Sequence, residues 1–422
     1  MTSAPPSSEN QDRPPLIVDL FAGPGGLDIA AEMLDLPTIG VEWEKSTRET
    51  RRAAGLRTTT IHDVAKVNPL DPEVASARVL TGGPPCQTFS VAGNREGHRA
   101  LDEVQDLAQL VGRSETVGEL EKAWAMVEDR ARILEWTDER TGLVLQPLRW
   151  IAEKRLKSDP YEAVVLEQVP TVLPVWRKYR DVLRELGYDA ECDILHTEEY
   201  GVPQTRRRAV LIARYRGGTG QGLAFPEPTH QRYRKGAERL PVPGHGTSDP
   251  DTSQKPLFEI EGRKRQGRPW GWVSMGDALR ETRSEDFVVR SNYGSGGDPA
   301  KRGIRTSDMP SATVTGKVRR NKVFTVKRVL KNGELELGPE QARFEPCEAG
   351  LLQTFPSEYP WKGTDVAQQI GNAIPPLLAV HVLCTALELD EDRKQRAIDA
   401  LKAWSPPHSQ ETVVTPEALP PS

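Results

Sequence analysis

Residues 15–26, Pro15-Leu16-Ile17-Val18-Asp19-Leu20-Phe21-Ala22-Gly23-Pro24-Gly25-Gly26, decide how this chain folds. The first part is an apolar run typical of a buried parallel strand, and it leads straight into a glycine-rich turn. A helical pattern follows from Leu27 to about Leu34. Strand, glycine-rich turn and helix in this order form the first unit of a doubly wound α/β sheet. Many glycine-rich turns are only tight turns, but here the glycines also allow a ligand to approach the helix N-terminus.

The following strands end in polar side chains that fit a nucleoside pocket. Glu42 and Trp43 follow the expected strand 38–41, about 20 residues after the glycines, where a carboxylate grips a ribose. Asp63 follows a short expected strand at 58–61 and could accept from an exocyclic amine. Each carboxylate alone could equally be solvated or cap a helix. Further strands are expected at 77–81, 163–166, 188–195 and 209–213.

A rigid loop with one thiol follows the fourth strand. It reads Gly82-Gly83-Pro84-Pro85-Cys86-Gln87-Thr88-Phe89-Ser90. Two glycines and two prolines stop the strand and fix the loop, which is one way to present a nucleophile. A small buried cysteine in a turn is the alternative, because a free cysteine also behaves as a core hydrophobe.

Charged residues mark two more strand ends. Glu167 ends the fifth strand shortly before Pro170, as a site residue does. Arg206, Arg207 and Arg208 precede the last apolar strand and suit a planar oxygen-rich ligand or phosphates, or else form a solvated basic edge. Because side chains alternate along a strand, Arg206 and Arg208 should share one face and Arg207 should point away.

Composition divides the chain into segments. Residues 228–343 hold 23 Lys and Arg against 14 Asp and Glu, whereas the whole chain has a net charge of −5. A basic segment in an acidic chain indicates a face for a polyanion, although a solvated variable surface has the same composition. Thr313 and Lys317 lie in one candidate loop, and residues 291–297 form another. The expected divisions are a disordered arm 1–14, a first domain 15–216 with a helical insertion 97–138, a loop-rich domain 217–340, a return to the first domain 341–395 and a disordered tail 405–422.

Composition also excludes several classes of protein. Four cysteines are scattered without a CxxC pair, which argues against a zinc site or a disulfide framework. No run of about 18 apolar residues is present, so no membrane helix is expected. The polar N-terminus lacks an apolar signal core, and we therefore expect a cytoplasmic protein with no metal.

Taken together, the motifs resemble those of the DNA (cytosine-5) methyltransferases. The matching stretches are DLFAGPGGLD (19–28), GGPPCQTFS (82–90), LEQVP (166–170), GVPQTRRRAVLIAR (201–214), RFEPCEAGLLQTFP (343–356) and QQIGNAIPP (368–376). They occur in the family's order. The resemblance implies an S-adenosylmethionine-dependent fold with a smaller target-recognition domain, acting on duplex DNA as a monomer. It also implies a restriction-modification system with a separately acting endonuclease.

The resemblance assigns roles to individual residues. Cys86 would be the nucleophile that attacks C6 of a flipped cytosine, Glu167 would contact N3 of the base, and Arg208 its carbonyl, with Gln87 beside them. S-adenosylmethionine would be held by Phe21, Gly23, Gly25, Gly26, Glu42, Trp43, Asp63, Pro84 and Asn372. DNA would be contacted by Ser90, Arg206, Thr313 and Lys317, with Arg206 near the phosphates.

One position departs from the family pattern, and the sequence also leaves three alternative functions open. The family commonly has Glu-Asn-Val where this chain has Glu167-Gln168-Val169, so the loop that the Asn normally braces could change its geometry. Methylation of tRNA by a sister branch and a catalytically silent DNA-binding relative are alternatives. A nicotinamide-dependent oxidoreductase would explain the glycine-rich turn but neither Cys86 nor the arginines.

Overall fold

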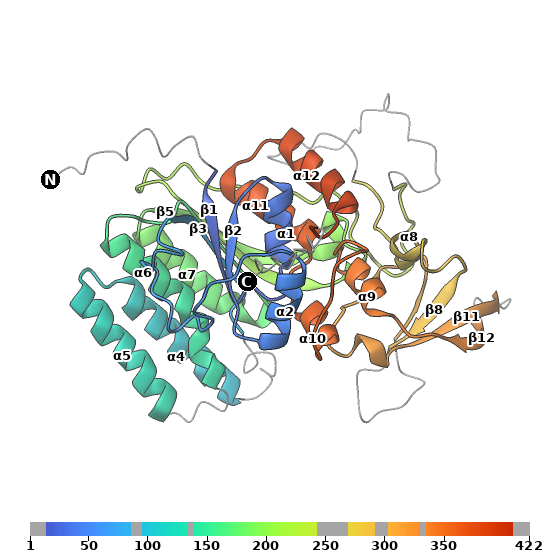
Figure 1. Ribbon diagram of the computed structural model, residues 1–422, viewed down its shortest axis with the longest axis horizontal. Helices are drawn as coiled ribbons and strands as arrows, with labels where there is room; N and C mark the ends of the chain where they lie inside the picture. The colour runs from blue at the N-terminus through green and yellow to red at the C-terminus, as the bar shows by residue number, and fades with distance from the viewer. Residues whose placement is uncertain are drawn as a thin grey trace, which may run out of the picture.

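A six-stranded sheet forms the centre of the molecule (Figure 1). The computed structural model describes residues 14–85, 95–133, 139–242, 269–291, 303–329 and 335–407. The strand order is β2-β1-β3-β4-β7-β5; the first four strands are parallel, and β7 runs antiparallel to both of its neighbours. The strands are β1 Leu16–Leu20, β2 Thr38–Val41, β3 Ala77–Gly82, β4 Ala163–Gln168, β5 Tyr188–His196 and β7 Arg207–Tyr215. The expected α/β fold is therefore confirmed.

The expected strand at 58–61 is wrong. Only one isolated bridge, between Gly40 and Thr58, is present there. The segment has no apolar alternation to bury, and Ile61 is 43% exposed. Thr59 adds one backbone hydrogen bond to Gly40, so the segment follows the edge of β2 without becoming a strand.

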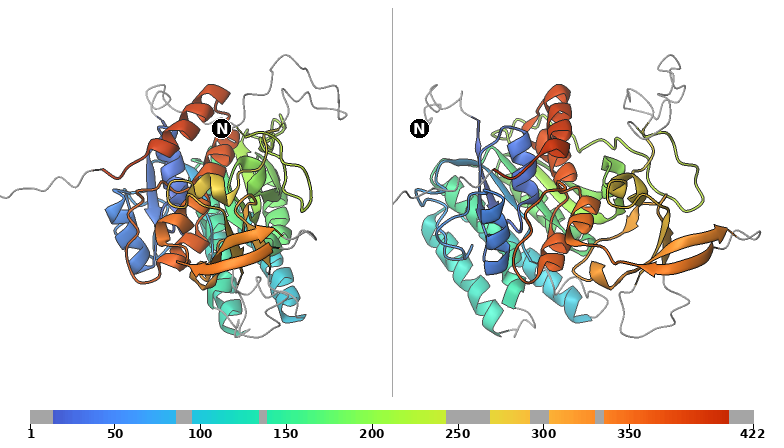
Figure 2. Two further views of the ribbon diagram at one scale, coloured as in Figure 1. Left: turned by 90° about the vertical axis from the view of Figure 1, so that its right-hand side faces the viewer. Right: turned by 45° about the vertical axis from the view of Figure 1, so that its right-hand side comes forward.

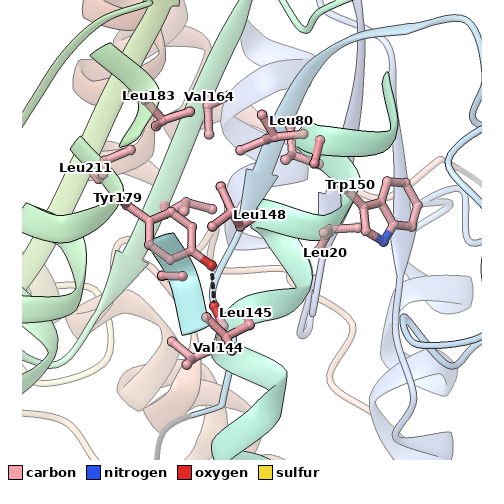
Figure 3. Packing of buried hydrophobic residues seen from close by; sticks show 14 of the residues in the cluster. Leu20, Leu80, Val144, Leu145, Leu148, Trp150, Val164, Tyr179, Leu183 and Leu211 are labelled. Atoms are coloured by element: carbon pink, nitrogen blue, oxygen red, sulfur yellow. Dashed lines mark hydrogen bonds between the residues drawn. The ribbon is translucent and has the colours of Figure 1, made fainter. Parts of the chain in front are cut away.

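Helices cover both faces of the sheet, because neighbouring strand residues point to opposite sides (Figures 1 and 2). On one face Val18, Leu80 and Val164 pack with α4 Arg95–Gly112, α5 Val117–Ile133, α6 Gln146–Leu156 and α7 Leu173–Glu185. Figure 3 shows this core, where the Tyr179 hydroxyl donates to the carbonyl of Val144 at 2.6 Å. On the other face Ile17 packs with α1 Gly26–Met33, α11 Pro376–Leu387 and α12 Glu391–Ala403.

The predicted pair of helices at 97–138 exists as α4 and α5. Val104, Ala108 and Val111 of α4 are fully buried, and Leu120 and Val127 of α5 are nearly so. All of them belong to the same core as the sheet. This pair is therefore part of the main core.

A four-stranded antiparallel sheet supports the smaller domain, where the sequence indicated mainly loops. Its order is β12-β11-β8-β9, with α8 Met275–Leu279 packed beside it. The strands are β8 Phe287–Arg290, β9 Ile304–Thr306, β11 Lys322–Val329 and β12 Leu335–Gln341. The core of this domain also takes in Phe344, Leu352 of α9 Pro346–Leu352 and Ile370 of α10 Val366–Asn372. Residues after 341 thus contribute to both domains, because Phe355 and Tyr359 already pack with Ile29 of α1.

The two domains are joined by a short parallel pairing. β6 Gln204–Thr205 pairs with β10 Ser311–Ala312. The Gln204 side chain adds two hydrogen bonds to this connection. Its nitrogen donates to the carbonyl of Leu352 at 2.9 Å, and its oxygen accepts from the backbone amide of Val314 at 3.0 Å. Short 3-10 helices connect other elements, at Glu139–Leu145, Pro170–Val172, Thr197–Tyr200 and Val318–Arg320. The helix α2 Lys45–Ala53 follows β2.

Among the described residues, one stretch is long and apolar enough to cross a membrane, Val366–Leu387. Within this stretch α10 ends at Asn372 and α11 begins at Pro376. Its apolar window is 72% buried inside the protein. It is accordingly a helical segment of the core, and its apolar character is explained by packing.

Candidate active site

The register of the sheet brings the predicted site residues to one edge. Leu20 at the end of β1 pairs with Val41 of β2 and with Gly82 of β3, and Gly82 pairs with Leu166 of β4. The residues that follow these four strand positions therefore emerge side by side. They are Phe21, Glu42, Gly83 and Glu167.

The glycine-rich turn after β1 is tight on one side and open on the other. Phe21 has a φ of 60° and Gly23 one of 57°, in the left-handed region that costs a non-glycine residue free energy. A Cβ on Gly25 would lie 2.1 Å from Leu56 Cδ1, and one on Gly26 would lie 2.1 Å from the Ile374 oxygen. A Cβ on Gly23 would meet nothing within 4 Å. Packing thus requires the later glycines, while Gly23 borders space that a ligand can enter.

Glu42 holds this turn from the end of β2. Its carboxylate accepts hydrogen bonds from the Gly23 amide at 2.8 Å and from the Glu44 amide at 2.7 Å. Burial raises the pKa of Glu42, and the two amide donors oppose that shift. Trp43 beside it is 66% exposed, so its aromatic face is accessible.

The remaining predicted cofactor residues lie at the ends of other segments. Asp63 accepts a hydrogen bond from the Ala65 amide at 3.0 Å and lies 3.6 Å from the Lys66 amine, so it caps its own turn. Asn372 is exposed at the end of α10, where its side chain accepts from Gln368 at 2.7 Å. Pro84 is buried in the loop after β3.

A buried ion pair behind the turn was not predicted from the sequence. Arg51 of α2 donates two hydrogen bonds of 2.8 Å to Asp28 of α1, and both side chains are fully buried. Arg51 also donates to the carbonyls of Gly23, at 3.4 Å, and Arg57, at 2.9 Å. Burial alone would lower the pKa of Arg51, but the Asp28 charge raises it above its usual value. In the sequence, nothing distinguishes Arg51 from the other arginines of α2.

Glu167 and Arg208 form an ion pair where β4 lies beside β7. Arg208 Nε lies 2.5 Å from Glu167 Oε1, and each side chain is 12% exposed. Burial lowers the pKa of Arg208, and the Glu167 charge opposes the shift. A Cβ on Gly83 would lie 3.7 Å from Glu167 Oε2, so the carboxylate lies against the start of the Pro-Pro-Cys loop. Cys86, Gln87 and Ser90 themselves lie outside the described residues.

The buried position of Arg206 contradicts the prediction that this residue lies near DNA phosphates. It is 0% exposed and donates to the carbonyls of Val314 at 2.9 Å, Gly371 at 2.8 Å and Ala373 at 3.2 Å. Burial lowers its pKa below the usual value. Its guanidinium therefore joins three chain segments inside the protein and has no surface left for a phosphate. Arg207 is exposed on the neighbouring position.

The loop 313–317 is fixed against α10. Thr313 donates from its hydroxyl to the Thr205 carbonyl at 2.9 Å. A Cβ on Gly371 would lie 2.4 Å from the Gly316 nitrogen, so this close approach of the two backbones needs a glycine at position 371. Lys317 is exposed at the end of the loop and is followed by exposed Arg319 and Arg320. Of the other candidate loop, 291–297, only Ser291 is among the described residues.

The central sheet with helices on both faces defines a doubly wound α/β protein. The comparison with known families is more specific. The model of the C-5 cytosine-specific DNA methylase family matches residues 16–108 and 135–387. The chain belongs to this family, whose members methylate cytosine in DNA at C5. The match leaves out residues 109–134, which contain α5, and everything after residue 387, which contains α12.

Curated relatives resemble the chain over most of its length. The type II methyltransferase M1.HphI of Haemophilus parahaemolyticus is 24% identical over 383 residues, covering 88% of this chain and 87% of the relative. M.NgoFVII of Neisseria gonorrhoeae is 25% identical over 404 residues, covering 92% and 90%. M.NaeI of Lentzea aerocolonigenes is 29% identical over 406 residues, covering 91% and 78%.

Solved structures share the fold. The Dnmt2 methyltransferase of S. pombe has a TM-score of 0.50 at 17% identity, covering 88% of this chain and 98% of that chain. A mutant of Spodoptera frugiperda DNMT2 has a TM-score of 0.51 at 14% identity, covering 88% and 99%. At these identities the likeness concerns the architecture alone.

Proposed function

We propose that this chain transfers a methyl group from S-adenosylmethionine to C5 of a cytosine in duplex DNA, with Cys86 as the nucleophile. The observation that carries the proposal is the Glu167–Arg208 pair, which lies against the start of the loop that leads to Cys86. An acid and a guanidinium fork at this place are complementary to N3 and the carbonyl of a cytosine.

The roles of the side chains follow from the reactivity of cytosine. C5 is a poor nucleophile until a thiolate adds to C6, so the Cys86 sulfur must be deprotonated and form the S–C6 bond. Glu167 donates a hydrogen bond or proton at N3 as charge develops on the ring, and Arg208 binds the carbonyl oxygen. When bound, S-adenosylmethionine would supply an electrophilic methyl group to C5, and the electron pair of the broken S–CH3 bond would stay on its sulfur, so that S-adenosylhomocysteine leaves. Loss of the C5 proton then returns the electron pair to the ring and breaks the S–C6 bond.

The residues around the glycine-rich turn fit S-adenosylmethionine. Gly23 borders open space, Trp43 offers an exposed ring, and the Glu42 carboxylate is fixed at the turn. Each Glu42 oxygen accepts one amide and keeps capacity for a ribose hydroxyl. Phe21, Gly25, Gly26, Asp63, Pro84 and Asn372 complete the proposed pocket.

The cytosine must leave the helix to reach Cys86, because its C6 is otherwise stacked between neighbouring bases. Lys317, with Arg319 and Arg320, is the exposed basic group that we assign to the DNA backbone, next to Thr313. The names of the type II relatives support a restriction-modification role. A separate endonuclease as partner, a monomeric state and a cytoplasmic location are further parts of the proposal.

Methyl transfer from labelled S-adenosylmethionine tests the proposal. Duplex DNA should be labelled by the unsubstituted protein and not by Cys86→Ser, while tRNA should remain unlabelled. DNA with 5-fluorocytosine at the target should form an adduct that survives denaturation. An equal adduct with Cys86→Ala would remove Cys86 from the mechanism. Bisulfite sequencing of DNA from expressing cells would then identify the recognition sequence.

A further inference from the structure

An aromatic cluster lies behind the glycine-rich turn. Tyr359 is at its centre, with ring centroids 4.8 Å from Phe355, 4.7 Å from Trp361 and 5.4 Å from Trp404. Tyr359 is 4% exposed and Trp404 7%. The cluster also contains Ile29 of α1, so it packs against the helix that the turn begins.

Tyr359 contacts the turn directly. Its hydroxyl donates a hydrogen bond to the carbonyl of Pro24. A Cβ on Gly25 would lie 3.0 Å from that hydroxyl, so the backbone approaches the ring as closely as glycine permits. Glu42 binds the Gly23 amide in the same turn. Two side chains from distant parts of the chain thus fix two peptide groups of the turn.

Trp404 reaches the cluster from outside the region that the family shares. It follows α12, which begins after the end of the family match at residue 387. Arg393 anchors this helix by donating to the carbonyl of Leu34 at the end of α1. Farther along, a Cβ on Gly55 would lie 2.5 Å from Pro407 Cγ, so the segment after α12 packs tightly near the end of α2.

We propose that Tyr359 is a positioning residue for the cofactor-binding turn and that Trp404 fixes its ring. This inference rests on the proposed function, because it assigns S-adenosylmethionine to that turn. The turn contains Phe21 at a φ of 60°, a left-handed conformation that costs a non-glycine residue free energy. This conformation persists only when the surroundings of the turn determine it, so loss of the Pro24 contact reduces the population that is ready to bind.

Tyr359→Phe tests the inference, because it removes the hydroxyl and keeps the ring. Tyr179→Phe is the matched control. Tyr179 of α7 is also buried, and its hydroxyl donates to the backbone carbonyl of Val144 in the main core, away from the glycine-rich turn. Both variants should lose similar thermal stability. Calorimetry with S-adenosylhomocysteine should show about five- to tenfold weaker binding for Tyr359→Phe and unchanged binding for Tyr179→Phe. In Tyr359→Phe the KM for S-adenosylmethionine should also rise, with kcat less affected. Trp404→Leu should likewise weaken the binding of S-adenosylhomocysteine and raise the KM for S-adenosylmethionine.

The outcomes separate the two proposals. If the unsubstituted protein does not bind S-adenosylhomocysteine, the proposed function fails and this inference with it. If the unsubstituted protein binds and Tyr359→Phe binds equally well, this inference alone fails. Equal weakening in Tyr359→Phe and Tyr179→Phe would also overturn it, because the effect would then be a general loss of stability.

Discussion

The Gln168 side-chain amide donates a hydrogen bond of 2.7 Å to the carbonyl of Pro84. The strand that carries Glu167 therefore also holds the loop that leads to Cys86. Gln168 is one methylene longer than the Asn that the family commonly has, and the structure shows that the longer side chain still reaches this loop. Its own oxygen accepts from the Val169 amide, which fixes the orientation of the side chain.

Gln168→Leu should lower the rate of methyl transfer by about five- to tenfold and leave the affinity for S-adenosylhomocysteine unchanged. The substitution shortens the side chain by one atom and removes the donor to Pro84, so the loop loses one hydrogen bond. Single-turnover rates and calorimetry measure the two effects. Gln395→Leu on the exposed face of α12 is the control. A normal rate in Gln168→Leu would show that the loop is held by other contacts.

Arg206→Met should lower the free energy of unfolding by about 3 kcal/mol, because three buried carbonyls lose a charged donor. Arg207→Met changes an exposed side chain and should shift stability by less than about 0.5 kcal/mol. Urea unfolding followed by circular dichroism gives both values. A stable Arg206→Met protein with reduced salt dependence of DNA binding would instead restore the phosphate role.

The strands and their ends were predictable because buried parallel strands are short apolar runs bounded by turn residues. Leu16–Leu20 and Ala163–Gln168 were found this way, and the polar residues after them lie at the expected edge. The predicted strand at 58–61 is wrong because threonine residues favour strands, but this segment buries too little apolar surface to pair fully with β2.

The buried hydrogen bonds of Arg206 and Tyr359 were not predictable from the sequence. A run of three arginines beside an apolar strand looks the same whether its side chains meet DNA or carbonyls. Arg206 is buried only because Val314, Gly371 and Ala373 converge on it from positions more than 100 residues away in the chain. Tyr359 is similar, because its contact with Pro24 depends on how α11 and α12 return to the first helix.

His381→Phe should remove part of the acid sensitivity of the fold. His381 of α11 is 3% exposed and lies against Tyr200; burial, with the Lys394 and His230 charges, lowers its pKa to about 3. The unfolded chain binds a proton at this histidine below about pH 6.5 and the folded chain does not, so stability falls as pH falls from 6.5 toward 3.

Relative to the unsubstituted protein, His381→Phe should therefore gain about 2 kcal/mol between pH 7 and pH 5. Urea unfolding at several pH values measures this difference. The pKa values of His196 and His230 are also lowered, to about 4, mainly by burial, but both residues are present in the two proteins and cancel in the comparison. A difference that does not change with pH would mean that the pKa of His381 is the same in the folded and the unfolded chain.

Arg208→Lys should lower the single-turnover rate by one to two orders of magnitude and change DNA affinity by less than about threefold. Lysine keeps the charge beside Glu167 but loses the planar fork and the Nε donor that now lies 2.5 Å from that carboxylate. Glu167→Gln should be more severe, by about two to four orders of magnitude, because it removes the acid at N3. Arg207→Lys is the matched control on the exposed neighbouring position. Methylation rates at saturating DNA, with anisotropy for binding, test all three variants. If Arg207→Lys were as damaged as Arg208→Lys in a normally folded protein, the base would have to bind on the other face of β7.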